Sequence, residues 1–317
     1  MNTTASTAQI QETLQGVYEK YKDVRDGEVA TYIPELAKAK PDDFGISLAT
    51  VDGQVFSVGD FQQEFTIQSI CKPFAFLMAL EEFGRDAVLQ KVCVEPSGDA
   101  FNSIELEPRT MRPFNPMINA GAIAIVSMIK KSSRDAGVQH YVNKMQLAAG
   151  RTLGIDQAVL TSEAATGNRN RAIAYLMLNC GIIDAEVDHA LHQYFTQCSL
   201  LVNSQDLAMM AATLANMGIN PVTGNQAFEL EYVKDVLAVM FTCGLYDYAG
   251  EWAYRVGLPA KSGVGGGIIA VSPGKFGIAV VSPPLDDAGN SVRAQRAITA
   301  ISNALGGSPY VAAKAKE

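Results

Sequence analysis

The sequence predicts an α+β fold in which an antiparallel sheet lobe, flanked by helices, carries an inserted all-helical lobe. Two strand-forming stretches, at 44–60 and 260–284, lie far apart in the chain, and helix after helix separates them. A chain that leaves a sheet and later returns to it builds that lobe from both of its ends. We therefore expect a single domain of 317 residues, with the sheet lobe at about 1–66 and 228–317 and the helical lobe at about 67–227.

The N-terminal part of the sheet lobe begins with an amphipathic helix. Ile10, Leu14 and Val17 recur at helical spacing, which predicts a helix within residues 7–24. The stretch "FGISLATVDGQVFSVGD" then reads as two strands on either side of Asp52-Gly53, a dipeptide that favours tight hairpin turns. A small antiparallel sheet is expected to begin here.

The middle of the chain, from Ser69 to about Gly224, reads as consecutive helices. Examples are "AGAIAIVSMIKK", "NRNRAIAYLMLN" and "SQDLAMMAATLANMG". Gly, Asn and Pro residues between these segments mark helix ends and turns. We expect this inserted lobe to be entirely helical.

The C-terminal part returns to strands and ends in a helix. The stretch "AKSGVGGGIIAVSPGKFGIAVVSPP" reads as two apolar strands joined by "SPGK". The last helix, "SVRAQRAITAISNAL", is followed by Gly306-Gly307. A left-handed cap is expected there, because glycine adopts that conformation without steric cost.

Composition and charge exclude several classes of protein. Hydrophobic residues make up 48% and charged residues 18% of the chain, as in globular proteins with a sizeable core. The net charge of -8 argues against a nucleic-acid partner, because such binders carry a basic face. The N-terminus has no basic region followed by an apolar run, and no apolar stretch approaches the ~20 residues that span a bilayer. We expect a cytoplasmic protein with no membrane partner.

Cysteine and histidine usage favours neither disulfides nor metal. The five cysteines, an odd number, are scattered without C-x-x-C pairs, which is typical of reduced thiols in a cytosol. His189 and His192 lie three residues apart and could share a helix face, but a metal site needs further ligands around them. We expect no metal and no cofactor.

Ser69 and Lys72, in the stretch "FTIQSICKPF", are three residues apart, so on a helix they share one face. A Ser hydroxyl is a weak nucleophile, and a neutral Lys beside it can take its proton. The amine becomes neutral when burial or a second cation lowers its pKa, and Lys261 could provide that cation. In the alternative interpretation, Ser69 caps a core helix and the ammonium of Lys72 extends to water.

A second stretch, "KSGVGGG" at residues 261–267, favours the chemical interpretation. Serine acyl-transfer enzymes pair Ser-x-x-Lys with a Lys-Thr-Gly triad on a facing strand, and Lys261-Ser262-Gly263 matches it with Ser in place of Thr. A glycine-rich strand edge and a phosphate loop are the alternatives, although the G-x-x-x-x-G-K-[ST] signature of such a loop is absent.

The third element of these serine enzymes, Ser-Asp-Asn, is missing from the sequence. Tyr141-Val142-Asn143 has the related Tyr-x-Asn spacing, but its stretch "VQHYVNKMQ" looks exposed, so we expect no role for it. The chain thus resembles a β-lactamase or penicillin-binding-protein fold with different residues for its substrate.

Six blocks in one order resemble the serine-dependent glutaminases, a family with a β-lactamase-like fold. The blocks are "ATYIPELA", "FTIQSICKPF", "NPMINAGAI", "SEAATGNRNRAIAYL", "YFTQCS" and "CGLYDYAGEWAYRVGLPAKSGVGGGI". The resemblance covers nearly the whole chain. It implies hydrolysis of L-glutamine to L-glutamate and ammonia, and assembly as a homodimer or homotetramer.

The resemblance also implies roles for individual residues. Ser69 would be the nucleophile, Lys72 the base beside it, and Tyr246 an assistant in proton transfer near the leaving ammonia. The backbone N–H groups of Val264 and Ser69 would form the oxyanion hole. The residues expected at the bound substrate are Tyr32, Gln68, Asn119, Glu163, Asn170, Tyr194, Tyr246 and Val264. Lys261 and Ser262 are expected to support the site.

The chemistry of free glutamine is consistent with these positions. Glu163 offers a partner for the ammonium of the amino acid, and the Asn and Tyr side chains offer neutral hydrogen bonds. Taken singly, each has another interpretation. Glu163 could lie in a solvated loop, Asn170 could start a helix, and the tyrosines could belong to the core. In the family form Ser is expected where Cys71 stands, and we expect the Cys71 side chain to point away from the catalytic line.

Two other functions are consistent with the same nucleophile and fold. A β-lactam-reactive serine hydrolase should carry an export signal and a Ser-Asp-Asn element, and the sequence shows neither. A non-catalytic glutamine-binding sensor would bind glutamine without releasing ammonia.

Overall fold

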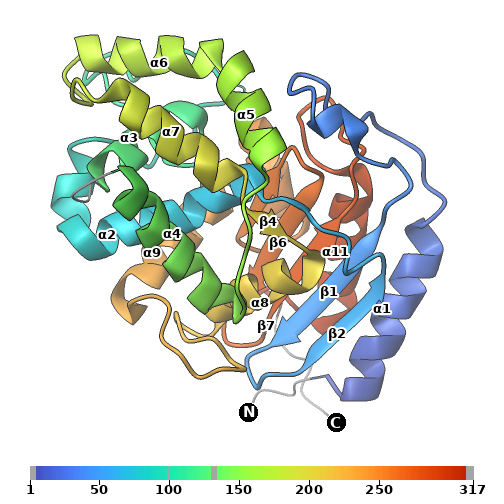
Figure 1. The fold of residues 1–317 in the computed structure, drawn as a ribbon. Coiled ribbons are helices and arrows are strands. Elements are labelled where there is room, and N and C mark those ends of the chain that lie inside the picture. The colour runs from blue at the N-terminus through green and yellow to red at the C-terminus, as the bar shows by residue number, and fades with distance from the viewer. Residues whose placement is uncertain (1–4, 99, 101, 130–133, 312–317) are drawn as a thin grey trace.

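A five-stranded antiparallel sheet forms the centre of the fold (Figure 1) in the computed structural model, which describes residues 5–98, 100, 102–129 and 134–311. Its strands follow the order β2-β1-β7-β6-β5. Their bounds are β1 Gly45–Thr50, β2 Val55–Gly59, β5 Ala260–Gly263, β6 Gly267–Ser272 and β7 Phe276–Val281. β1 pairs with β7, with Gly45 opposite Val281, so the sheet joins both ends of the chain. The α+β fold class is therefore confirmed.

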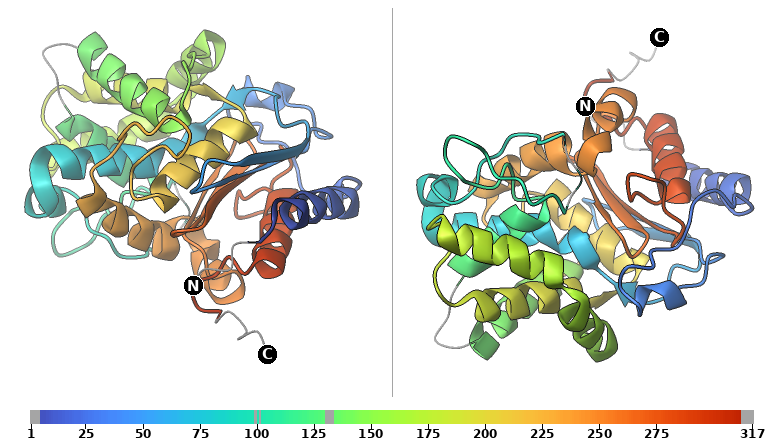
Figure 2. Two further views of the ribbon diagram at one scale, coloured as in Figure 1. Left: turned by 90° about the horizontal axis from the view of Figure 1, so that it is seen from below. Right: turned by 90° about the horizontal axis from the view of Figure 1, so that it is seen from above.

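Two helices, α1 (Thr7–Tyr21) and α11 (Val292–Leu305), lie side by side on one face of the sheet (Figure 2). Alternate strand residues such as Ile46 and Val280 point to this face and are fully buried. Gly306 ends α11 with φ 60°, in the left-handed region. The cap predicted from the glycine pair is confirmed.

The helix α8 (Ser204–Ala215) covers the other face, where it crosses β1, β6 and β7. The side chains of Ile269 and Val271 point to this face and join the larger of the cores. Gly277 permits the close approach of α8 to β7, because a Cβ at that position would collide with the backbone of Ala211 and Ala212. The sheet is thus buried on both faces.

Most of the remaining helices form a body beside the sheet (Figure 1). They are α2 Lys72–Leu89, α3 Asn119–Met128, α4 Arg134–Ala149, α5 Gln157–Thr166, α6 Asn168–Asn179, α7 Val187–Cys198 and α9 Leu230–Cys243. The short α10 (Ala249–Arg255) instead contributes Trp252 to the core beneath α1 and α11. Short 3₁₀ turns are η1 Leu36–Lys38, η2 Gln68–Cys71 and η3 Tyr246–Tyr248. The buried α3 packs against α2, α6 and α7. The end of the predicted "AGAIAIVSMIKK" helix lies outside the described residues, and the lobe boundaries stay a prediction.

Two details of the predicted elements are wrong. The inserted region is not entirely helical, because β4 (Leu201–Val202) pairs with β3 (Phe65–Thr66) in a two-stranded ribbon. The C-terminal stretch forms three strands rather than two, because a turn at residues 264–266 separates β5 from β6. Gly266 adopts φ +94° in this turn, a conformation that glycine allows and that a continuous strand would not contain.

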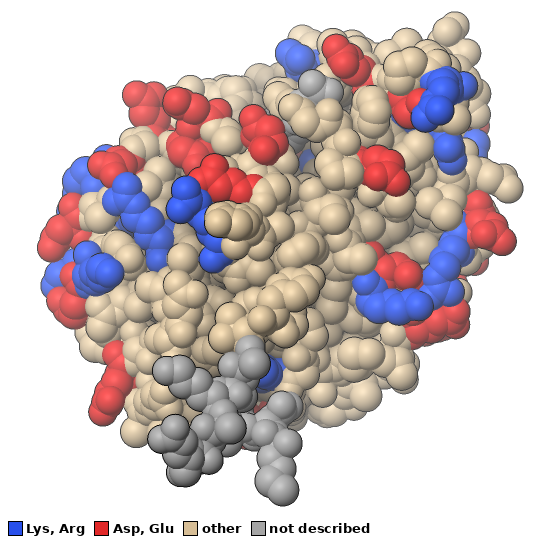
Figure 3. Space-filling view, turned by 180° about the vertical axis from the view of Figure 1, so that it is seen from behind, with Lys and Arg blue, Asp and Glu red and all other residues tan. Residues whose placement is uncertain are grey.

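The surface mixes charges of both signs. Figure 3 shows Lys and Arg side chains interspersed with Asp and Glu on the face seen from behind. Within the described residues, no helix combines the length and the apolar composition needed to cross a bilayer.

Candidate active site

Ser69 lies in η2, the tight turn that leads directly into α2. Gln68, just before it, is a non-glycine residue with φ 49°, a left-handed conformation that costs about 1–3 kcal/mol and persists only where the surroundings hold it. A main-chain bond from Ile67 N to Leu200 O (2.9 Å) fastens the turn to the helical body. The position of Ser69 is therefore set by contacts on both sides of the turn.

The alternative interpretation of Ser69 and Lys72 is wrong. Cys71, not Ser69, occupies the cap position of α2, and it makes no side-chain cap bond. Lys72 is only 1% exposed, so its ammonium does not reach water. Ser69 itself is 5% exposed, on the wall of a cavity.

Lys72 has the surroundings that a base requires. Its Nζ donates to Oδ1 of Asn119 (2.7 Å), a neutral acceptor. Burial lowers the pKa of Lys72 to about 8, against weaker opposing effects of Cys198, Cys71 and Glu163. A substantial fraction of the amine is thus neutral in mildly alkaline solution.

Asn119 connects three elements through its side-chain amide. Its Oδ1 also accepts from the hydroxyl of Tyr194 in α7 (3.2 Å), and its Nδ2 donates to Oδ1 of Asn170 in α6 (2.9 Å). The structure thus brings together Lys72, Asn119, Tyr194 and Asn170, which are far apart in the sequence. Asn170 lies in the first turn of α6, so it both starts a helix and lines the cavity.

Glu163 is a buried carboxyl on α5, which rules out the solvated-loop alternative. Burial raises its pKa well above 4.5, the proximity of Cys198 adds to this, and Lys72 acts in the opposite direction. Its Oε2 has no hydrogen-bond partner among the described residues. An unsatisfied buried carboxyl oxygen on a cavity wall indicates a ligand that brings its own donor, such as an ammonium group.

Tyr246 approaches Ser69 from the sheet side. It begins η3 with φ 57°, a second non-glycine residue held in the left-handed region. Its hydroxyl donates to the carbonyl oxygen of Ser262 (3.1 Å), and a side-chain hydrogen bond joins it to Ser69. Because its proton goes to the carbonyl, the phenol oxygen is the acceptor for the hydroxyl of Ser69. Burial raises the pKa of Tyr246, so the phenol stays protonated at neutral pH.

The strand β5 packs beside η2, and successive side chains along it point to opposite faces of the sheet. Lys261 pairs with Ile269, and Ser262 pairs with Ile268. Opposed residues share a face, so the Lys261 side chain lies on the side of the helical body. The side chain of Ser262 lies on the other side, and its carbonyl oxygen accepts from Tyr246. A Cβ on Gly263 would lie 3.0 Å from Ile67 O, so a side chain there would move β5 and η2 apart by a few tenths of an ångström.

One cavity of about 250 Å³ collects most of the predicted substrate residues. Its lining includes Ser69, Gln68, Tyr32, Asn119, Glu163, Asn170, Tyr194 and Val264. Lys72 and Tyr246 do not line it. From behind the cavity wall, Lys72 contacts Asn119 and Tyr246 contacts Ser69. Val264 stands in the turn after β5, opposite η2, and is 4% exposed.

The sequence predictions missed other residues of this wall, which are Ile33, Asn102, Thr166, Gly167 and Arg169. Arg169 and Gly167 lie inside the block "SEAATGNRNRAIAYL", from which Glu163 and Asn170 were predicted as site residues. Membership of this block was therefore the sequence feature that could have pointed to them. The guanidinium of Arg169 donates from Nε to the carbonyl of Asn102 (2.6 Å). This bond closes the edge of the cavity between the start of α6 and the segment before α3.

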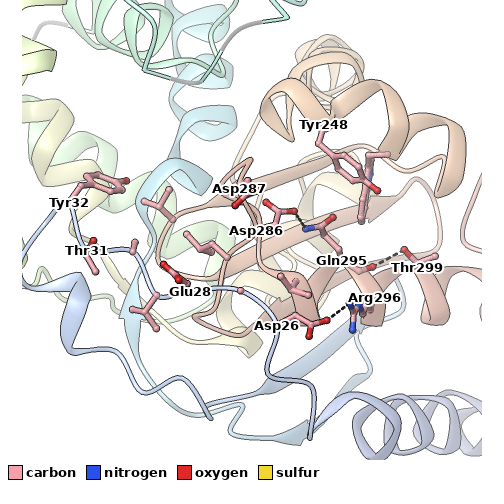
Figure 4. A pocket seen from close by; sticks show the side chains of 18 of the residues that line it. Asp26, Glu28, Thr31, Tyr32, Tyr248, Asp286, Asp287, Gln295, Arg296 and Thr299 are labelled. Atoms are coloured by element: carbon pink, nitrogen blue, oxygen red, sulfur yellow. Dashed lines mark hydrogen bonds and ion pairs between the residues drawn. The ribbon is translucent and has the colours of Figure 1, made fainter.

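A larger, more open cavity of about 1200 Å³ adjoins the first (Figure 4). Tyr32, Asn102 and Val264 line both, and Tyr32 is 53% exposed between them. Carboxylates such as Asp26 and Asp286 line the larger cavity, where Asp26 pairs with Arg296 (2.6 Å) and Asp286 accepts from Gln295 (2.7 Å). The smaller cavity therefore opens past Tyr32 into a polar hollow.

Four further residues that the sequence analysis singled out lie away from the cavity lining. Cys71 is buried, and its thiol forms a hydrogen bond with that of Cys198 on α7. Tyr141 is 1% exposed, so its stretch only looked exposed; it joins the core from α4, while Asn143 is exposed. His189 bonds Gln193 (3.0 Å), and within the described residues no group of three or more His, Cys, Asp and Glu could hold a metal ion.

Comparisons with known proteins give a consistent result. The glutaminase family model matches residues 27–310. The chain is 56% identical over 293 residues to a glutaminase of Trichormus variabilis, with coverage of 92% of this chain and 88% of the relative. A glutaminase of Nostoc sp. is 55% identical with the same coverage.

Solved structures agree with the sequence relatives. The structure of the probable glutaminase ybaS has a TM-score of 0.94 at 39% identity and covers 96% of this chain and 99% of that one. A structure described as Mglu in its glutamate form has a TM-score of 0.92 at 40% identity, with coverage of 96% and 71%.

Proposed function

This chain belongs to the glutaminase family, and from that premise we propose that it hydrolyses the side-chain amide of L-glutamine through an ester on Ser69. The reaction yields L-glutamate and ammonia. One observation carries the proposal: Ser69 and Glu163, whose carboxyl oxygen Oε2 has no partner among the described residues, line the same cavity. The same cavity thus offers a nucleophile and a partner for an ammonium group, as an amino-acid substrate requires.

The first half-reaction forms the ester. Neutral Lys72 takes the hydroxyl proton of Ser69, whose oxygen attacks the amide carbon of glutamine. The N–H groups of Ser69 and Val264 hold the oxyanion. The C–N bond then breaks, and the leaving nitrogen takes a proton through Lys72 or Tyr246 and departs as ammonia. The hydrogen bond between Tyr246 and Ser69 supports this assignment of the phenol.

The second half-reaction releases the product. Water attacks the glutamyl ester, and the amine of Lys72 takes a proton from that water. The C–O bond to Ser69 breaks, the serine oxygen regains a proton, and L-glutamate leaves. A related structure is described in a glutamate form, which is the product of this step.

Recognition of free glutamine follows from the cavity. Glu163 receives the ammonium, while Asn119, Asn170 and the hydroxyls of Tyr32 and Tyr194 provide hydrogen bonds for the α-carboxylate, with Gln68 beside the chain of the substrate. Burial raises the pKa of Glu163 in the free enzyme, and the ammonium of the substrate acts in the opposite direction, so the carboxylate form is stabilised when substrate binds.

Two alternatives make different predictions. Drug-sized ligands occupy sites of about 300–1,000 Å³. The cavity of about 250 Å³ lies below that range and favours a free amino acid over a β-lactam. A glutamine sensor would need no base, whereas burial lowers the pKa of Lys72 beside a buried serine.

The test is ammonia release by wild type and Ser69→Ala, with glutamine, asparagine and a chromogenic cephalosporin as substrates. We expect wild type to release ammonia from glutamine and Ser69→Ala to retain less than about one part in 10³ of that rate. Equal rates for the two proteins would disprove the role of Ser69. Turnover of the cephalosporin alone would favour the β-lactam alternative, and binding of glutamine without turnover would favour the sensor.

We also infer that the enzyme works in the cytoplasm as a homodimer or homotetramer. All five cysteines are free thiols, which suits a reducing compartment. Cell fractionation tests the location, and light scattering on a size-exclusion column tests the assembly. A monomer in solution or a periplasmic enzyme would contradict these inferences.

A further inference from the structure

Lys261 is a buried lysine to which the proposed mechanism gives no step. Its side chain is 0% exposed on β5. The titratable groups that act on it are Lys72, Cys71 and Cys243, with no carboxylate among them. Burial lowers the pKa of Lys261 well below its usual value, and a buried amine still needs hydrogen-bond partners.

The contacts of Lys261 converge on Tyr246. Its Nζ donates to the carbonyl oxygen of Ser262 (2.6 Å), the same oxygen that accepts from the Tyr246 hydroxyl (3.1 Å). The Nζ also lies 4.2 Å from the centroid of the Tyr246 ring, within the range of a cation–π interaction. Lys261 thus contacts both the face of the phenol and the acceptor of its proton.

We propose that Lys261 is a positioning residue that fixes the phenol of Tyr246 in its hydrogen bond to Ser69. The inference rests on the proposed function. Tyr246 holds a left-handed backbone conformation, which would relax to a more populated region if nothing opposed it. The amine of Lys261 packs on the face of the ring and shares the carbonyl acceptor of the phenol, and these two contacts leave the phenol oxygen directed at Ser69.

The experiment compares Lys261→Met, Lys261→Arg and a matched control, Lys275→Met. Lys275 also donates to a carbonyl, that of Gly306 (2.6 Å), but it lies in the β6–β7 turn, outside the site. We expect Lys261→Met to lower kcat by about 10²-fold with KM within about threefold, the size of a lost proton-transfer contribution. Lys261→Arg keeps a hydrogen-bond donor at this position and should lose less kcat than Lys261→Met, and the control should keep wild-type kcat.

A double-mutant cycle tests the route through Tyr246. If Lys261 acts by holding the phenol, Lys261→Met costs less in a Tyr246→Phe background than in wild type, whereas fully additive losses overturn the proposal. Thermal melts show which variants are folded, and if Lys261→Met is not, Lys261→Gln replaces it in the cycle. If wild type itself released no ammonia from glutamine, the proposed function would fail instead, so the two failures are distinguishable.

Discussion

The Nζ of Lys72 lies 2.7 Å from Oδ1 of Asn119, so the first residue of α2 is bonded to the first residue of α3. An amide oxygen accepts this bond without bringing a negative charge. A carboxylate there would favour the ammonium and raise the pKa of the lysine. Asn119 thus orients the amine and still leaves its pKa at about 8.

The pH dependence of kcat/KM should report Lys72. The neutral amine is the active form, so the rate of wild type should rise as pH increases through about 8. Asn119→Asp places a carboxylate on the amine, favours its charged form and should shift this limb upward by at least about one pH unit. Asn143→Asp, an exposed position on α4, serves as control. An unshifted limb in Asn119→Asp contradicts Lys72 as the base.

Replacement of Glu163 should separate binding from stability. Glu163→Gln removes a charged hydrogen bond to the substrate, so KM should rise about 10- to 100-fold. Burial raises the pKa of Glu163 above 4.5, so the stability linked to this group is present at pH below 4.5 and is lost as pH rises through the folded value.

At neutral pH, Glu163→Gln should therefore unfold at the same or a higher temperature than wild type. The control is Glu12→Gln, at an exposed position of α1, which should change neither KM nor the unfolding temperature. A variant that binds glutamine normally would rule out Glu163 as the ammonium partner.

A methyl group at Gly263 should disturb the site without unfolding the protein. The added Cβ would meet Ile67 O at 3.0 Å and Ile70 Cγ1 at 3.2 Å, so β5 must move by a few tenths of an ångström from η2. We expect Gly263→Ala to lower kcat on the order of tenfold, because small misplacements of reacting groups are costly.

Gly16→Ala is the matched control, since nothing lies within 4 Å of its added Cβ in α1. This variant should gain about 0.5–1 kcal/mol in free energy of unfolding and keep wild-type turnover. Wild-type turnover in Gly263→Ala as well would show that the spacing of β5 and η2 is not critical.

The thiol of Cys71 should be dispensable for catalysis. This thiol is hydrogen-bonded to the thiol of Cys198 and does not line the cavity. We therefore expect Cys71→Ser to keep glutamine turnover within a few-fold of wild type. Loss of activity on the scale of Ser69→Ala, in a folded variant, would place Cys71 in the reaction.

The hairpins and amphipathic helices could be predicted because their signals are local. Asp52-Gly53, the spacing of Ile10 and Leu14, and the glycine pair after α11 each act within a few residues. The break at residues 264–266 was missed because glycines are compatible with both a strand and a turn. The ribbon of β3 and β4 was missed because each strand has two residues and gains its register from a distant partner.

The candidate site divides in the same way. Ser69 and Lys72 are visible as a spaced pair, and the family blocks carry their distant partners. Strand pairing, which a single sequence does not reveal, decides that Lys261 faces the site with its side chain and Ser262 with its carbonyl. Tyr141 was predicted to be exposed because its stretch is largely polar, yet its side chain is buried. One face of a largely polar helix can still pack into the core.

The bond from Ile67 to Leu200 and the contact of η2 with Gly263 have a consequence for biosynthesis. A ribosome delivers residue 69 long before residues 200 and 263, so the turn that bears the nucleophile has nothing to fold against during most of translation. Contacts of such long sequence separation also form late in folding. Hydrolytic capacity should therefore arise in one step, after β5 is synthesised, and the nascent chain should carry a serine that is still unreactive.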